Sequence, residues 1–133
     1  MEANNNHKLP SKKLQTWPVT KDFAKRIYEV TEQFPSTEQY ELTAQIERAS
    51  VSVMSNIAEG SARTSKRDQA HFSQLAPGSL MEAACQLQFA QKMGFISVED
   101  YKGLKEYITK LSKKLTTVEF HYCKNRKHRA VCT

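Results

Sequence analysis

The sequence has no long hydrophobic run and only a sparse set of cysteines. Its 133 residues include four glycines, four prolines and three cysteines. No apolar stretch approaches the ~20 residues that span a membrane, and the first 13 residues lack the apolar core of a secretory signal. An odd, sparse set of cysteines does not build a disulfide scaffold. These absences predict a cytoplasmic protein with reduced thiols and no membrane association.

The signatures of common catalytic and cofactor sites are also missing. The sequence contains no phosphate-binding glycine loop, no dinucleotide fingerprint and no His-Glu-x-x-His zinc motif. Its four histidines stand at positions 7, 71, 121 and 128, too far apart in sequence to suggest a catalytic cluster. We therefore expect a protein that is not an enzyme and needs no cofactor.

Strand signals are absent, whereas helical spacing of apolar residues is widespread. No alternating strand pattern and no Asn-Gly or Asp-Gly hairpin pair occurs. Apolar residues recur every three or four positions in four segments joined by short loops. Short loops place consecutive helices side by side in opposite directions. The sequence thus predicts an all-α, antiparallel up-down-up-down four-helix bundle.

Local signals set the expected helix boundaries. The first helix is predicted over residues 18–33, and the second from a capping box at Ser36 to a left-handed cap at Gly60. The third is predicted over residues 64–94, kinked but unbroken at Pro77, with Cys85 as a small buried residue. The fourth starts with a capping box at Ser97, and its inner face is predicted to consist of Tyr101, Leu104, Ile108, Leu111, Leu115, Val118 and Tyr122.

Charge and periodicity divide the chain into three parts. Residues 1–13 are polar and aperiodic, which predicts a disordered arm. Residues 14–123 form the bundle, and residues 124–133 form a basic tail. The net charge of +6 lies near the C-terminus, since residues 102–133 hold nine Lys and Arg against two Glu. A basic excess of this kind suits contact with a polyanion, although a solvated helix face has the same composition.

The second helix carries an unusual polar stripe. Its members recur at helical spacing but include few of the Lys and Glu side chains that typify a solvated face. We interpret them, with two residues of the third helix, as a hydrogen-bonded structural seam in which Arg48 pairs with Glu82. A ligand site or an oligomer contact are the alternatives. The predicted seam consists of Gln45, Arg48, Ser52, Asn56, Glu59, Ser79 and Glu82.

Two further candidate sites lie near the C-terminus. One is a set of basic residues that are expected to contact phosphate groups, or else to remain a solvated face: Lys105, Lys110, Lys113, Lys114, Lys124, Arg126, Lys127 and Arg129. The other is a weak zinc candidate, without the usual Cys-x-x-Cys pair, that consists of His121, Cys123, His128 and Cys132. A basic tail without metal is the preferred interpretation of that second set.

The polar stripe and its surroundings resemble a known family. The block Asn56-Ile57-Ala58-Glu59-Gly60, preceded by Arg48 and Ser52 and followed by Gly78-Ser79-Leu80-x-Glu82, resembles the bacterial four-helix-bundle proteins encoded in intervening sequences of 23S ribosomal RNA genes. The resemblance covers about residues 14–115. It departs from the family pattern at Glu47, where many relatives have a basic residue, and at Pro77, where a helix former is expected.

The resemblance implies properties that the residues alone do not. It implies a bundle that assembles into a homopentamer, and a related accessory protein of diversity-generating retroelements is implicated in binding nucleic acid through a basic surface. Together with the basic C-terminal region, it leads us to expect a homo-oligomer that binds nucleic acid, RNA before DNA. The alternative is a module that binds a protein partner and has no nucleic-acid role.

Overall fold

The computed structural model describes residues 11–124, with side chains at positions 16–37, 41–72 and 74–115. Four α-helices make up most of this part of the chain: α1 (Ser11–Thr31), α2 (Ala44–Ala62), α3 (Lys66–Lys92) and α4 (Val98–Lys124). A 3-10 turn (Ser36–Glu38) and a π-helical turn (Gln39–Thr43) precede α2. The described residues contain no strand. The all-α prediction is therefore confirmed.

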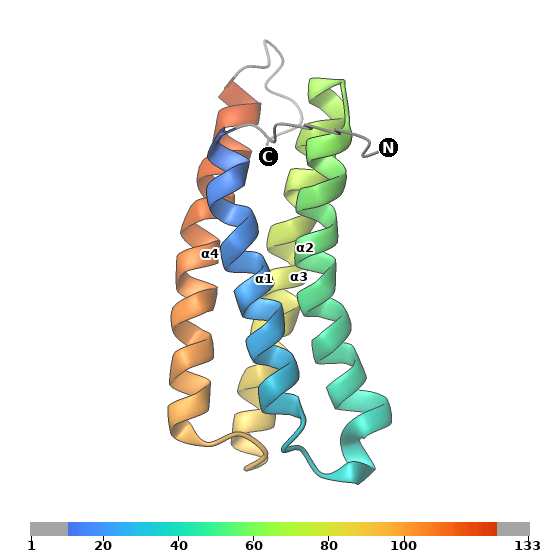
Figure 1. Cartoon of the computed structure of the whole chain (residues 1–133), viewed down its shortest axis with the longest axis vertical. Coiled ribbons are helices and arrows are strands. Elements are labelled where there is room, and N and C mark those ends of the chain that lie inside the picture. The colour runs from blue at the N-terminus through green and yellow to red at the C-terminus, as the bar shows by residue number, and fades with distance from the viewer. Residues whose placement is uncertain (1–10, 125–133) are drawn as a thin grey trace, which may run out of the picture.

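Consecutive helices run in opposite directions (Figure 1). The connections from α1 to α2 and from α3 to α4 lie at one end of the bundle, and the connection from α2 to α3 lies at the other. Each helix packs against two neighbours, since α1 contacts α2 and α4 while α3 contacts α2 and α4. This is the antiparallel up-down-up-down arrangement that the short loops predicted.

Three of the predicted helix ends are confirmed by their hydrogen bonds. Ser65 Oγ accepts from the backbone N–H of Asp68 at 3.1 Å, and Ser97 Oγ accepts from that of Asp100 at the same distance. At the end of α3, Gly94 has φ +81°, and the N–H of Phe95 donates to Ala90 at 2.9 Å. Gly94 can take this left-handed conformation without a Cβ clash, which closes the helix in a Schellman motif.

Other predicted boundaries are wrong. The first helix begins at Ser11 rather than Pro18, so residues 11–13 belong to α1 and not to the predicted arm, while residues 1–10 lie outside the described part. Gly60 is a buried residue within α2 rather than its cap, because the helix continues to Ala62 before the backbone extends at Arg63. The regular α-helix starts at Ala44, since the turns after Ser36 have 3-10 and π geometry.

The third helix is continuous through Pro77. An interior proline removes one backbone hydrogen bond and does not by itself end a helix that packs on two others. Cys85 is exposed on this helix, contrary to its predicted burial. Ala83 and Leu87, on either side of it in sequence, fill the core instead, and Cys85 lies on the opposite side of the helix.

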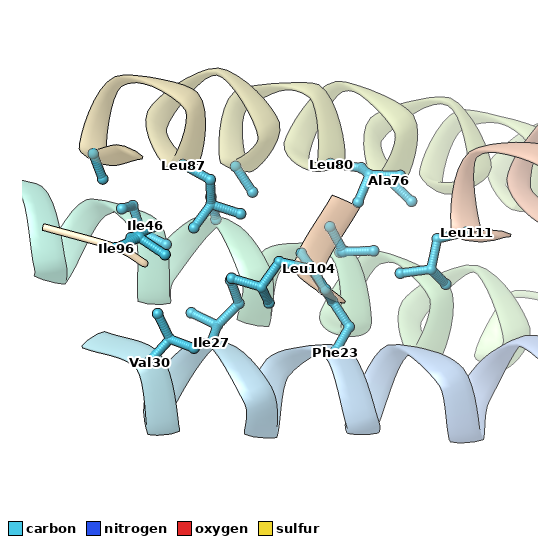
Figure 2. Packing of buried hydrophobic residues seen from close by; sticks show 14 of the residues in the cluster. Phe23, Ile27, Val30, Ile46, Ala76, Leu80, Leu87, Ile96, Leu104 and Leu111 are labelled. Atoms are coloured by element: carbon cyan, nitrogen blue, oxygen red, sulfur yellow. The ribbon is translucent and has the colours of Figure 1, made fainter. Parts of the chain in front are cut away.

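The apolar stripes of all four helices meet in one core (Figure 2). Phe23, Ile27, Ile46, Leu87 and Leu104 are fully buried. Of the inner face predicted for α4, Leu104, Leu111 and Leu115 are buried and Tyr101 and Ile108 are half-buried. The side chains of Val118 and Tyr122 lie outside the described residues. Burial of these stripes is the main favourable contribution to folding.

Small side chains are common among the buried residues of α2 and α3. Ala49 on α2 and Ala76, Ala83 and Ala90 on α3 are buried at this contact or beside it, and these two helices share the most extensive contact in the bundle. Alanine keeps little side-chain bulk between two helix backbones, so the axes can approach.

In the described part of the chain, no helix has the length and apolar character needed to cross a membrane.

Truncation of a core leucine should lower stability strongly. Leu104 is fully buried in the four-helix core, so Leu104→Ala removes apolar contacts and leaves a cavity, and we expect a loss of about 2–5 kcal/mol. Urea denaturation followed by circular dichroism, at one fixed protein concentration, measures this loss. Val98→Ala is the matched control, because Val98 is 72% exposed and its truncation should change stability by less than about 0.5 kcal/mol. Equal effects of the two substitutions would contradict this description of the core.

Candidate nucleic-acid interface

Five lysines on the outer side of α4 form a basic surface. They line a shallow, open hollow together with Glu106 and Thr109. We call this surface the α4 lysine face, and it consists of Lys102, Lys105, Lys110, Lys113 and Lys114. It extends over twelve residue steps, or about 18 Å of helix. A surface of this length can contact several phosphate groups of one nucleic-acid strand.

The core-facing leucines of α4 position these lysines. Leu104, Leu111 and Leu115 are buried against the other helices, and the lysines occupy the intervening positions of the same helix. A residue three or four positions along a helix lies on the same side, whereas residues halfway between lie opposite. Burial of the leucines therefore fixes the direction in which the lysines point, which is away from the bundle.

The α4 lysine face keeps most of its positive charge. Glu106 is the one acidic residue that lines the hollow. The ion pairs of the described side chains are formed by Arg26 and Arg63, so Lys102, Lys105 and Lys110 take part in none of them. Exposed ammonium groups without a carboxylate partner attract an anionic ligand through their combined field.

The structure describes only part of the predicted basic set. Lys105, Lys110, Lys113 and Lys114 lie on the face, and Lys102, which the sequence interpretation missed, lies with them. The position of Lys102 three residues before Lys105 was the sequence feature that could have identified it. Outside the described side chains are Lys124, Arg126, Lys127 and Arg129, and the zinc candidate made of His121, Cys123, His128 and Cys132. Among described residues, no group of three metal-binding side chains comes together.

Some residues of the predicted polar seam form hydrogen bonds with one another, and others do not. Ser52 Oγ and Ser79 Oγ lie 2.9 Å apart across the contact of α2 with α3. Asn56 Nδ2 donates to the Ser52 carbonyl at 2.9 Å and to Ser52 Oγ at 3.2 Å. Toward the other end of the contact, Gln86 Nε2 donates to Gln45 Oε1 at 3.3 Å. Direct hydrogen bonds thus cross between the two helices at two levels.

The charged members of the predicted seam do not join this network. Arg48 and Glu82 are both exposed, and no ion pair connects them in the described residues. Glu59 instead accepts from Arg63, which directly follows the same helix, at 3.2 Å, with both side chains about half exposed. Water solvates these charges at the surface, which avoids the large cost of burying them. The predicted Arg48–Glu82 pair within one chain is therefore wrong.

Two polar contacts that the sequence interpretation missed connect α1 to its neighbours. Thr31 Oγ1 donates to Glu47 Oε1 of α2 at 2.8 Å, so Glu47 has a structural partner on α1. Arg26 donates to Asp100 Oδ1 of α4 at 2.7 Å. Both contacts join residues of different helices, so no local spacing in the sequence predicts them.

Comparisons with known proteins agree with this architecture. The pattern of the 23S rRNA-intervening sequence proteins matches residues 12–117, so the chain belongs to that family. A crystal structure of a protein of unknown function of the S23 ribosomal protein family, from Bacteroides thetaiotaomicron VPI-5482, shares the fold. The two chains are 21% identical, with a TM-score of 0.76 over 82% of this chain and 98% of the other. No curated protein matches the chain.

A double-mutant cycle should measure the serine contact between α2 and α3. Ser52→Ala and Ser79→Ala each remove one hydroxyl of the 2.9 Å pair, and the double variant removes both. We expect a coupling free energy of about 0.5–1.5 kcal/mol, typical of a hydrogen bond in a partly buried site. Urea denaturation of the four proteins gives this value. The pair Ser55→Ala and Ser97→Ala, on separate exposed positions, should show additive effects, and additivity in the Ser52–Ser79 cycle would show that the contact contributes nothing.

Proposed function

We propose that this protein is a non-enzymatic, oligomeric RNA-binding protein that contacts the phosphate backbone with the α4 lysine face. The observation that carries the proposal is the grouping of Lys102, Lys105, Lys110, Lys113 and Lys114 around one hollow with a single carboxylate. The basic residues beyond Lys124 extend the same end of the sequence and would add contacts. In an oligomer, several such faces would bind one strand together, which raises avidity without new contacts.

The composition of the face favours contact with phosphates over contact with bases. Lysine ammonium groups bind phosphate as point charges, whereas sequence is recognised by hydrogen bonds and stacking at the bases. The aromatic residues described on α4, Tyr101 and Tyr107, are half-buried toward the core, and Tyr107 contacts Phe23 with ring centroids 6.4 Å apart. We therefore expect binding with little sequence preference and with strong salt dependence.

RNA is the first ligand to test, because the family description refers to a ribosomal RNA. Fluorescence anisotropy of a labelled RNA hairpin should show binding that weakens steeply between about 50 and 200 mM salt. The variant Lys102→Gln, Lys105→Gln, Lys110→Gln should lower the slope of log K against log salt by about 2 to 3, since each lost contact removes about 0.7–0.9. A chain that ends at Tyr122 tests the contribution of the tail in the same assay.

A charge-matched control separates the face from net charge. Lys25→Gln, Lys66→Gln and Arg67→Gln remove the same three charges from exposed positions of α1 and α3, and they should leave the salt slope close to that of the unmodified protein. Equal losses in both triple variants would mean that net charge alone attracts the RNA. Absence of binding at low salt would overturn the proposal and favour a module that binds a protein partner.

A further inference from the structure

The lysines of the α4 lysine face are divided between two flanks of the helix. Lys110 and Lys114 follow Tyr107 by three and seven positions, which places them on the same side of α4 as that residue. Tyr107 contacts Phe23 of α1, with ring centroids 6.4 Å apart. These two lysines therefore lie on the flank of α4 that borders α1, and we call them the α1-side pair.

The first two lysines of the face lie on the other flank. Lys105 follows Tyr101 by four positions and precedes Ile108 by three, so these residues share one side of the helix. Around the helix axis, Lys105 and Lys110 are about 140° apart. The flank away from α1 borders α3, the other helix on which α4 packs. Lys102 precedes Lys105 by three positions, and we call these two residues the α3-side pair.

Glu106 and Thr109 lie between the two pairs along the helix. Both side chains are exposed and line the same hollow as the lysines. Glu106 takes part in none of the ion pairs of the described side chains. Thr109 Oγ1 donates to the Lys105 carbonyl at 3.0 Å, so its oxygen can still accept a hydrogen bond. The strip between the pairs thus presents hydrogen-bond acceptors and one negative charge.

This distribution of charge suits two nucleic-acid strands better than one. A single strand that joined the two pairs would bring its phosphates beside the Glu106 carboxylate, and like charges in contact are unfavourable. In a duplex, each pair contacts the phosphates of its own strand, and the strip faces the groove between the strands. The minor groove of an RNA duplex is wide and shallow and displays 2′-hydroxyls and base edges rather than phosphates.

The face also lacks the groups that hold unpaired bases. Single-stranded RNA is bound by aromatic rings or arginine planes on which its bases stack. The helix α4 contains no arginine, and Tyr101 and Tyr107, the aromatic residues among its described side chains, are half-buried against the core. Paired bases already stack on one another inside a duplex, so a duplex needs no such platform on the protein.

We infer that the ligand of the α4 lysine face is duplex RNA, with the α3-side pair on the phosphates of one strand and the α1-side pair on those of the other. Glu106 lies over the minor groove and accepts a hydrogen bond from a 2′-hydroxyl, a group that DNA lacks. The inference rests on the proposed function and names the form of RNA that the same site binds.

Fluorescence anisotropy of the full-length chain with three probes tests the inference. The probes are an RNA duplex of about 16 base pairs, a length that a small duplex-binding domain spans, an oligouridine strand of the same length, and a DNA duplex of the same sequence. At one fixed salt concentration, the RNA duplex should bind at least about tenfold more tightly than the single strand, because it engages both pairs.

A double variant tests each pair. Lys102→Gln with Lys105→Gln should lower the ratio of duplex affinity to single-strand affinity, because the duplex loses its contacts to one strand while a single strand can still bind the other pair. The same change in the α1-side pair should have the same effect. Lys25→Gln with Lys66→Gln is the control, since it removes two charges from exposed positions on α1 and α3, and it should leave the ratio unchanged.

Glu106→Ala tests the contact with the 2′-hydroxyl. Loss of the carboxylate charge raises the affinity for both duplexes, so the ratio of RNA-duplex affinity to DNA-duplex affinity isolates the hydrogen bond. This ratio should fall by about two- to tenfold, the effect of one hydrogen bond. Glu99→Ala is the matched control and should leave the ratio unchanged, because Glu99 is exposed in the first turn of the same helix and does not line the hollow.

The outcomes separate this inference from the proposed function. A single strand that binds as tightly as the RNA duplex, or a Glu106→Ala variant with an unchanged ratio of the two duplex affinities, would overturn the inference and leave the proposed function intact. Absence of binding to both RNA probes at low salt would overturn the proposed function itself.

Discussion

The close approach of α2 and α3 is the constraint on which the rest of the bundle depends. Ala49, Ala76, Ala83 and Ala90 leave little side-chain volume at or near this contact, so the two backbones pack closely and the Ser52 and Ser79 hydroxyls reach each other at 2.9 Å. A larger residue at one of these buried alanines would separate the helices and force strained side chains around it. Large residues such as Phe23 on α1 and Leu104 on α4 complete the core.

The fold followed from the sequence because each helix has a separate local signal. The periodic apolar residues of α4, the serine caps at Ser65 and Ser97 and the left-handed Gly94 each act within a few positions of the chain, so spacing alone identifies them. The prediction that Gly60 caps α2 was wrong for the same reason, because it too rested on a local pattern. A glycine near the end of an apolar stripe has the same local pattern whether it caps the helix or packs inside it, and burial by other helices decides between the two.

The candidate site was less accessible to sequence reasoning. Helical spacing brought Ser52 and Asn56 together correctly, but whether Arg48 and Glu82 lie inside or outside the seam depends on a rotation of the helices that spacing does not determine. The contact of Arg26 with Asp100 joins positions 74 residues apart, and no local pattern predicts a contact of that kind. The lysines of α4 were visible in sequence as a charge excess. Their grouping around one hollow became visible only when the buried leucines fixed the orientation of the helix.

The antiparallel order of the helices has a consequence for the connectivity of the chain. The start of α1 and the end of α4 lie at the same end of the bundle, as does the turn from α2 to α3 (Figure 1). The Arg26–Asp100 contact shows that the first and last helices are neighbours in space as well. A circular permutant that links these two ends and opens the chain between Ala62 and Lys66 would keep every pair of packed helices. The packing of the helix pairs defines this protein, and the order of the helices along the chain does not.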